Sequence, residues 1–196
     1  DLKEYIKYLN NENLNEKSIA RNISSLKSFY KFLVINRYIN NNVSDVLYLP
    51  KVKKSLPNIL TEEEVLKLLN IKLIDNFSYR NKAMLELMYA TGLRVSELIN
   101  LTPLNIDFDK QLVRCYGKGN KERIVYLGSY AIDSLNDYLN IRKEILKNKN
   151  NDYLFLNHLG NKLTSRGISD IIDNILKKTC SNLKITPHTF RHSFAT

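Results

Sequence analysis

The chain of 196 residues contains no tryptophan and has two cysteines, four prolines and six glycines. Cys115 and Cys180 lie far apart without the spacing of metal ligands, so we expect reduced, half-buried thiols in an intracellular protein. No apolar run reaches the roughly 20 residues that a membrane-spanning helix needs. The sequence therefore argues against a disulfide-stabilised secreted domain and a helical membrane protein, and it predicts a cytoplasmic location with no membrane partner.

Acidic residues are scarce relative to basic ones. The chain has 30 lysines and arginines against 20 aspartates and glutamates, which gives a formal net charge of +10. Such an excess favours a polyanionic partner, of which nucleic acid is the commonest and an anionic membrane surface is the alternative. A hydrophobic content of 43% is enough to bury a core in one large domain or in two small ones.

Several patterns of common catalytic sites are missing as well. The sequence has no Ser-His-Asp order, no G-x-S-x-G elbow and no Walker A loop. It also has no paired-carboxylate site, which argues against Mg²⁺-dependent phosphoryl transfer. His188 and His192 stand four residues apart without a third ligand at suitable spacing, and His158 lies in a predicted surface turn. We therefore expect no metal and no cofactor.

Hydrophobic periodicity divides the chain into two domains. Residues 1–48 carry apolar side chains at helical spacing and predict a small helical domain. Residues 49–58, LPKVKKSLPN, place three lysines between two prolines and predict an extended basic linker. Residues 59–196 form the second domain, which begins with a helix cap at Thr61 and a capping acid at Glu64.

The second domain combines helices with a small sheet. A helix ends at Gly92, and the period then becomes alternating over NIDFDKQLVRCYG and KERIVYLG, which predict antiparallel strands around a tight turn. Helices are predicted over residues 129–147 and from Thr164, with a short strand at residues 152–157 between them. Thr186 and Pro187 begin a last helix. The expected fold is mainly α with a small antiparallel β-sheet.

Arg94 is the first candidate for chemistry in this domain. It follows the helix end at Gly92 in ATGLRVSEL and has the donors for bidentate binding of a phosphate. Glu97, three residues further on, is placed to orient the guanidinium. The alternative is a local Arg–Glu ion pair on a helix surface, which contributes little.

Two further basic sites follow along the chain. Lys118 lies between two glycines at the predicted hairpin tip of YGKGNKER, where a mobile amine can donate a proton to a leaving alkoxide. The alternative for Lys118 is an ordinary solvated turn lysine. His188 and Arg191 share one face of the last helix, near an N-terminus that favours anions. Together these groups suit a phosphate whose charge is neutralised without a metal.

Three strings, TGLRVSEL, GKGNKER and PHTFRHSFAT, carry a family resemblance in this order and spacing. Behind a basic helical domain and a KVKK linker, they resemble the tyrosine site-specific recombinases of the phage integrase family, most closely the bacterial Xer type. The resemblance covers nearly the whole chain and is strongest over residues 85–196. It implies a SAM-like core-binding helical domain followed by a mixed α+β catalytic domain.

The resemblance also implies roles for individual residues. Arg94 and Arg191 would clamp the scissile phosphate, with Glu97 supporting Arg94. Lys118 would protonate the 5′-hydroxyl leaving group, and His188 would contact the phosphate and assist proton transfer. In this family a tyrosine hydroxyl attacks a DNA phosphodiester to give a 3′-phosphotyrosyl link, which strand exchange then reverses without ATP or a metal.

The sequence departs from the family pattern at the end of the chain. In the family a second His or Trp position and the nucleophilic tyrosine follow the H-x-x-R helix, and here nothing follows Thr196. None of the 12 tyrosines occupies the nucleophile position. We therefore expect a fragment clipped at both ends, which by itself is inactive for cleavage.

The implied function is Xer-type recombination for chromosome dimer resolution, performed on a double-stranded DNA site by a homo- or hetero-tetramer of protomers on paired sites. A phage or conjugative-transposon integrase is one alternative. A catalytically inactive DNA-binding module and a basic helical RNA- or DNA-binding protein are the others. Basic residues of the helical domain, the linker and the hairpin are candidate DNA contacts: Lys17, Arg21, Lys27, Lys51, Lys53, Lys54, Lys121 and Arg123.

Overall fold

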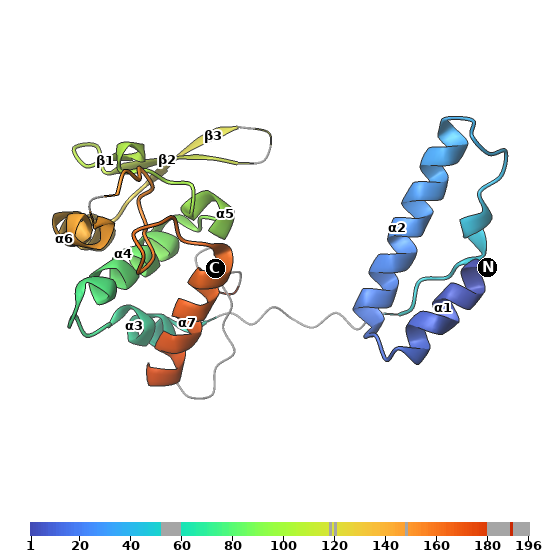
Figure 1. Ribbon diagram of the computed structural model, residues 1–196, viewed down its shortest axis with the longest axis horizontal. Coiled ribbons are helices and arrows are strands. Elements are labelled where there is room, and N and C mark those ends of the chain that lie inside the picture. The colour runs from blue at the N-terminus through green and yellow to red at the C-terminus, as the bar shows by residue number, and fades with distance from the viewer. Residues whose placement is uncertain (52–59, 118, 120, 148, 180–188, 190–196) are drawn as a thin grey trace. The chain divides into compact units, whose positions relative to one another are not determined.

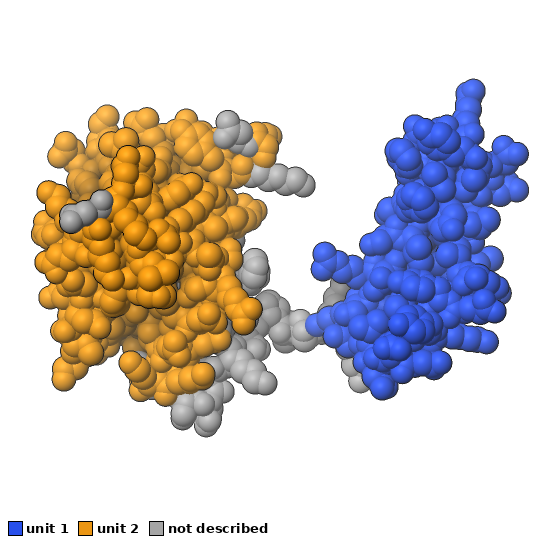
Figure 2. Space-filling model, viewed as in Figure 1, with its two compact units in different colours: residues 1–56 blue, residues 57–196 orange. Residues whose placement is uncertain are grey.

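The computed structural model describes residues 1–51, 60–117, 119, 121–147, 149–179 and 189 (Figure 1). The chain divides into two compact units, residues 1–56 and residues 57–196, which Figure 2 shows in different colours. The domain boundaries expected from the sequence, after residue 48 and before residue 59, stay predictions because residues 52–59 lie outside the described part.

The first unit is built from α1 (Leu2–Asn11), α2 (Glu16–Ile35) and a 3-10 turn over Val43–Val46. The side chain of Asn15 caps α2 by accepting the backbone N–H of Ser18 at 2.8 Å. The small core of this unit consists of Leu9, Ile19, Ile23 and Leu47. Its helical character agrees with the periodicity of the sequence.

The second unit combines five α-helices with a sheet in the described part of the chain. The helices are α3 (Glu62–Leu69), α4 (Asn76–Thr91), α5 (Val95–Leu98), α6 (Ser129–Leu146) and α7 (Ser165–Thr179), with a 3-10 turn over Pro103–Asn105. The strands are β1 (Ile106–Asp107), β2 (Leu112–Tyr116) and β3 (Glu122–Tyr126). A mainly α fold with a small antiparallel sheet is thereby confirmed.

Local signals set the ends of the first helices in this unit. The N–H of Glu64 donates to the Thr61 hydroxyl at 3.3 Å, and the Glu64 carboxylate accepts the N–H of Thr61 at 2.8 Å, so the predicted capping box forms. At the end of α4, Gly92 takes the left-handed conformation with φ 56°. A residue with a Cβ is strained there, which explains the glycine.

The sheet has the order β1-β2-β3 with antiparallel neighbours. Cys115 on β2 pairs with Arg123 on β3, whereas Arg114 pairs with Ile124. Because successive side chains on a strand point to opposite faces, Cys115 and Arg123 share one face and Arg114 lies on the other. Cys115 is buried and Arg114 is exposed, so the face that carries Arg123 is the inner one.

Helix α4 is the centre of the second unit. Residues 83–88 of this helix are all buried, and it packs against α6, α3 and β3. In Figure 1 the sheet lies on one side of α4 and the pair α3 and α7 lies on the other. Because α4 is covered on both sides, the turn that follows it has a fixed position.

One predicted strand differs in the structure, and one predicted helix is not described by it. The segment predicted as a strand at residues 152–157 makes a single bridge, between Leu156 and Lys162. Extended pairing stops because the side chain of Asn157 accepts the N–H groups of Leu159 at 2.9 Å and Asn161 at 3.0 Å, which closes a tight turn. The helix predicted from Thr186 and Pro187 lies outside the described residues.

The turn at Gly160 gives a test of this packing. Gly160 has φ +74°, and an added Cβ would lie 2.8 Å from the carbonyl oxygen of Leu146 at the end of α6. We expect Gly160→Ala to lower the free energy of unfolding by about 1–3 kcal/mol, because backbone atoms must shift. Urea unfolding followed by circular dichroism measures this.

The control for Gly160→Ala is Gly119→Ala. Gly119 has φ +77° and nothing lies within 4 Å of an added Cβ, so this variant has the strain of the left-handed backbone without the close contact. Equal losses in the two variants would contradict the packing of the turn against the end of α6.

Candidate functional site

The site begins where α4 ends. The N–H of Gly92 donates to the carbonyl oxygen of Met88 at 2.9 Å, and the left-handed residue turns the chain out of the helix. Leu93 is then buried, while Arg94 becomes the N-cap residue of α5 and leaves 54% of its side chain exposed. A buried residue followed by an exposed one presents the guanidinium of Arg94 at a fixed point of the surface.

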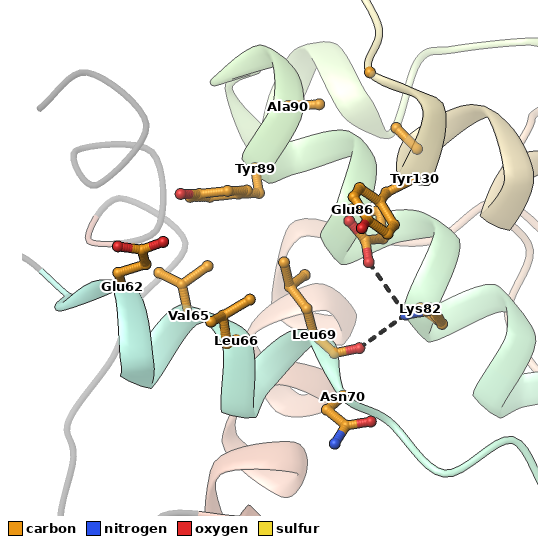
Figure 3. Close-up of a pocket in the computed structure, with 12 residues that line it drawn as sticks. Glu62, Val65, Leu66, Leu69, Asn70, Lys82, Glu86, Tyr89, Ala90 and Tyr130 are labelled. Atoms are coloured by element: carbon orange, nitrogen blue, oxygen red, sulfur yellow. Dashed lines mark hydrogen bonds and ion pairs between the residues drawn. The ribbon is translucent and has the colours of Figure 1, made fainter.

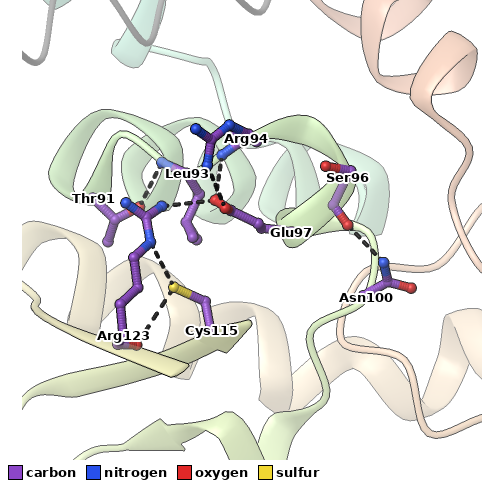
Figure 4. Close-up of polar contacts among 8 residues, drawn as sticks. All are labelled: Thr91, Leu93, Arg94, Ser96, Glu97, Asn100, Cys115 and Arg123. Carbon is purple, nitrogen blue, oxygen red and sulfur yellow. Dashed lines mark hydrogen bonds and ion pairs between the residues drawn. The ribbon is translucent and has the colours of Figure 1, made fainter. Parts of the chain in front are cut away.

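Glu97 holds Arg94 from the first turn of α5. One carboxylate oxygen, Oε2, accepts the backbone N–H of Arg94 at 2.8 Å, and the other, Oε1, accepts its Nη1 at 3.0 Å. Figure 4 shows both bonds. Glu97 therefore caps the helix and also orients the side chain of Arg94. An ion pair on a helix surface would not do both.

Arg123 approaches the same carboxylate from β3. Its Nη2 donates to Glu97 Oε2 at 2.7 Å, and its Nε donates to the sulfur of Cys115 at 3.1 Å (Figure 4). The side chain of Arg123 is 36% exposed, so it reaches from solvent to a buried partner. This long-range contact joins α5 to the sheet.

Burial and charge act in opposite directions on Glu97. Only 3% of its side chain is exposed, and this burial raises the pKa of the carboxyl group. The hydrogen bonds from Arg94 and the charges of Arg123 and Arg94 lower the pKa by more, so the net pKa lies below 4.5. Glu97 is thus ionised at neutral pH between two guanidinium groups, and the three groups together carry one net positive charge.

Cys115 is fully buried rather than half-buried as the sequence suggested, and it is a free thiol. Burial raises the pKa of this thiol, against the lowering effect of Arg123. The neutral sulfur therefore serves as a hydrogen-bond acceptor for Arg123 and not as a reactive thiolate.

The base of the hairpin lies against the carboxylate. The N–H of Gly117 donates to the carbonyl oxygen of Lys121 at 2.9 Å, and an added Cβ on Gly117 would lie 3.6 Å from Glu97 Oε1. Gly119 has φ +77°, a conformation that favours glycine. Lys121 is exposed. The stem of the hairpin thereby lies next to Glu97.

The structure brings part of the predicted site together. Arg94, Glu97 and Arg123 form one cluster, whereas Lys118, His188 and Arg191 lie outside the described residues, as do Lys53 and Lys54. In the first unit Arg21 and Lys51 are exposed and Lys27 is half-buried; Lys17 is exposed as well. The roles predicted for all of these residues stay predictions.

The contact of Arg123 with Glu97 is the feature that sequence reasoning did not identify. The sequence predicts Arg123 as a DNA contact and does not predict its contact with Glu97. Strand alternation carries the signal: Val113 and Cys115 are apolar positions of one strand, so the residues paired with them point to the same face. An arginine on that inner face needs acceptors for its N–H groups inside the protein, and Glu97 supplies one of them.

A cavity of about 630 Å³ lies between α3, α4 and the start of α6 (Figure 3). Its lining is largely apolar and includes Val65, Leu69 and Tyr89. Lys82 donates to Glu86 at 3.1 Å and to the carbonyl oxygen of Leu69 at 3.0 Å, so these two charged groups neutralise each other. The cavity lacks convergent groups for bond-making chemistry, and the cluster around Glu97 remains the candidate site.

Two other kinds of site have no support within the described residues. No group of three or more His, Cys, Asp or Glu side chains is gathered there in a way that could hold a metal ion. Among the helices of the same residues, none combines the length and the apolar character needed to cross a membrane.

Comparison with known families identifies the class of the chain. Residues 58–196 match the phage integrase family, and residues 1–36 match the SAM-like N-terminal domain of phage integrases. The chain belongs to the phage integrase family, and its resemblance to Xer-type tyrosine recombinases is confirmed by individual relatives.

One such relative is the tyrosine recombinase XerD of Halalkalibacterium halodurans, which is 43% identical over 194 residues, or 98% of this chain and 65% of that protein. Another is the tyrosine recombinase XerC of Anoxybacillus flavithermus, 39% identical over 200 residues, or 100% of this chain and 67% of that protein. The chain thus spans about two thirds of the length of these curated relatives.

The fold is that of solved recombinases. The crystal structure of the XerH site-specific recombinase bound to a palindromic difH substrate has a TM-score of 0.77 and 24% identity to this chain, and the match covers 100% of this chain and 57% of that one. The arrangement of helices around a small sheet is therefore the tyrosine recombinase fold.

The acid dependence of stability tests the charge state of Glu97. The pKa of Glu97 in the folded state is lowered from 4.5, so its contribution to stability is fully present above that value and is lost as the pH falls through the folded pKa. We expect Glu97→Gln to cost about 1–3 kcal/mol at neutral pH, because a buried charged acceptor is removed. We also expect this variant to lose less stability than the parent below about pH 4.

Urea unfolding at a series of pH values measures both effects. The control is Glu122→Gln, which removes an exposed carboxylate from the same hairpin and should retain the parent's fall in stability at acid pH. An identical acid dependence in the parent and in Glu97→Gln would contradict the assignment of a lowered pKa to Glu97.

Proposed function

We propose that this chain is the core of a site-specific DNA recombinase that cleaves and rejoins strands through a 3′-phosphotyrosyl intermediate. The observation that carries the proposal is the guanidinium of Arg94, which is half exposed and held by the buried Glu97. This arrangement occurs in a chain that is 43% identical to a tyrosine recombinase. The geometry supports binding of a phosphate at Arg94.

Arg94 has the properties that a phosphodiester requires. A guanidinium remains charged at any working pH and donates parallel N–H groups that match phosphate oxygens. Glu97 accepts a hydrogen bond from Nη1 of Arg94 and restrains that end of the guanidinium, while more than half of the side chain stays open to a ligand. A donor that is already oriented loses little energy in reorganising when negative charge develops on the phosphate.

The reaction that we propose conserves bonds at every step. A tyrosine hydroxyl oxygen forms a bond to phosphorus as the bond from phosphorus to the 5′-oxygen breaks, and the proton lost by the tyrosine is balanced by a proton delivered to the 5′-oxygen. Attack by a 5′-hydroxyl of the partner strand reverses this step. Because the phosphotyrosyl ester retains the energy of the cleaved phosphodiester bond, we propose that the reaction needs no cofactor.

The roles of the remaining residues are carried by the family resemblance. Lys118 is proposed as the acid that protonates the 5′-oxygen, and Arg191 is proposed as the second phosphate ligand. His188 is proposed to contact the phosphate and assist proton transfer. Gly117 precedes Lys118 in the chain and lies beside Glu97, the carboxylate that orients Arg94. This proximity supports the role proposed for Lys118.

Double-stranded DNA is the proposed substrate. XerH is bound to its difH substrate in the structure that shares this fold, and the present chain has a net charge of +10. We propose that protomers act as tetramers on paired sites in the cytoplasm, and that the reaction resolves chromosome dimers. The similarity to both XerD and XerC supports an Xer role over a mobile-element integrase.

Covalent trapping tests the proposed chemistry. The protein, expressed from its complete open reading frame, is incubated with sheared genomic DNA of its source, and adducts that survive detergent are counted. We expect adducts with the parent and about 100- to 1,000-fold fewer with Arg94→Ala, because one donor to the developing charge is lost.

The control for this experiment is Arg114→Ala, which removes the same charge from the outer face of the sheet and should leave adduct formation unchanged. A protein that binds DNA and never forms an adduct would be a catalytically inactive binding module, which is the competing function.

Binding of duplex DNA gives a second test that needs only the present chain. Lysines and arginines that contact phosphates release counterions, so we expect the affinity for a random duplex to fall at least about tenfold between about 50 and 200 mM salt. Fluorescence anisotropy with a labelled duplex measures this. An affinity that does not change with salt would argue against phosphate contacts and against the proposed substrate.

A further inference from the structure

We propose that Arg123 is a positioning residue for recombination, which acts on Arg94 through Glu97. This inference rests on the recombinase function proposed above, and it assigns to Arg123 a role directed into the protein instead of a direct contact with DNA. The argument follows the hydrogen bonds from the sheet to Arg94 (Figure 4).

The first step is the sharing of one carboxylate oxygen. Glu97 Oε2 accepts from the backbone N–H of Arg94 at 2.8 Å and from Nη2 of Arg123 at 2.7 Å. The other oxygen, Oε1, accepts Nη1 of Arg94 at 3.0 Å. Three donors therefore fix the position of the carboxylate, and the carboxylate in turn holds the guanidinium of Arg94 at Nη1.

The second step is the anchoring of Arg123 itself. Its Nε donates to the sulfur of Cys115 at 3.1 Å, and the two residues are paired across β2 and β3. Cys115 is buried with 1% exposure, so the sulfur is a fixed point of the sheet. Arg123, which is held by the sheet, thus fixes the position of Glu97, and Glu97 fixes the position of Arg94.

The third step is electrostatic. Among the described residues, the charged or titratable groups that face Glu97 include Arg94 at the start of α5, Arg123 from β3 and Cys115 from β2. Arg94 is 54% exposed and must also serve a ligand. Without Arg123 the buried carboxylate loses one of the two guanidinium groups that lower its pKa, and that pKa rises.

The experiment uses the protein expressed from its complete open reading frame and measures the rate of adduct formation at saturating genomic DNA. The variants are Arg123→Ala, Arg123→Lys and Arg114→Ala, each made in the parent and in a Glu97→Gln background. Arg114 is the matched control, because it lies on the adjacent strand and on the opposite face of the sheet. DNA affinity and thermal stability are measured in parallel.

We expect Arg123→Ala to slow adduct formation by about 10- to 100-fold, because misplacing a binding group by about an ångström has such an effect. The apparent Kd for DNA should change less than about threefold, since the proposed role is orientation. Arg123→Lys restores a cation near Glu97 and should recover much of the rate. Arg114→Ala should match the parent.

Two readouts separate positioning from a general loss of structure. The rate with Arg123→Ala should decline at a higher pH than the parent's rate as the solution is acidified, because Glu97 takes up a proton more easily. In the Glu97→Gln background the Ala substitution of Arg123 should have little further effect, because the residue through which it acts is gone.

Several outcomes would overturn the inference. If the parent is active and Arg123→Ala reacts at the same rate, the inference is wrong and the proposed function stands. The same holds if the effects of the Arg123 and Glu97 substitutions on the rate are independent and multiply. A parent that forms no adduct would overturn the proposed function and the inference with it. If Arg123→Ala does not fold, Cys115→Ala decides: we expect it to slow the reaction about 3- to 10-fold, and a parental rate would contradict the anchoring of Arg123.

Discussion

A buried carboxylate between two arginines is the interaction on which the candidate site depends. Glu97 is almost fully removed from solvent, and an isolated charge in such a place is strongly unfavourable. Two guanidinium groups and a backbone N–H offset that cost. The acid therefore stays charged where it ties the short helix α5 to the sheet, and the arginine that it orients remains available to a ligand.

The rest of the second unit holds this group in place. Helix α4 is buried along most of its length and ends at a left-handed glycine, so Leu93 enters the core and Arg94 emerges at one defined position. On the other side, Cys115 lies in the core face of the sheet and supports Arg123. Packing of apolar residues thus determines the geometry of a polar site at its edge.

The details of the site and of the helix ends that the sequence predicted depend on near neighbours along the chain. The capping box at Thr61, the helix end at Gly92 and the proximity of Arg94 to Glu97 each involve residues within four positions. The pairing of Arg123 with Glu97 spans 26 positions and depends on how the strands pair, which periodicity does not determine. The strand predicted at residues 152–157 shortened to a bridge because side-chain bonds of Asn157 closed a turn.

The pairing of Cys115 with Arg123 has a consequence for how the hairpin forms. A slip of one residue between β2 and β3 would reverse the faces of a strand and bring Glu122 or Ile124 to the place of Arg123. Glu122 would set a second negative charge beside Glu97, and Ile124 would leave the buried acid without that cation. The ion pair therefore distinguishes the correct strand alignment from its nearest errors, so the group that orders the site also selects the register in which the hairpin folds.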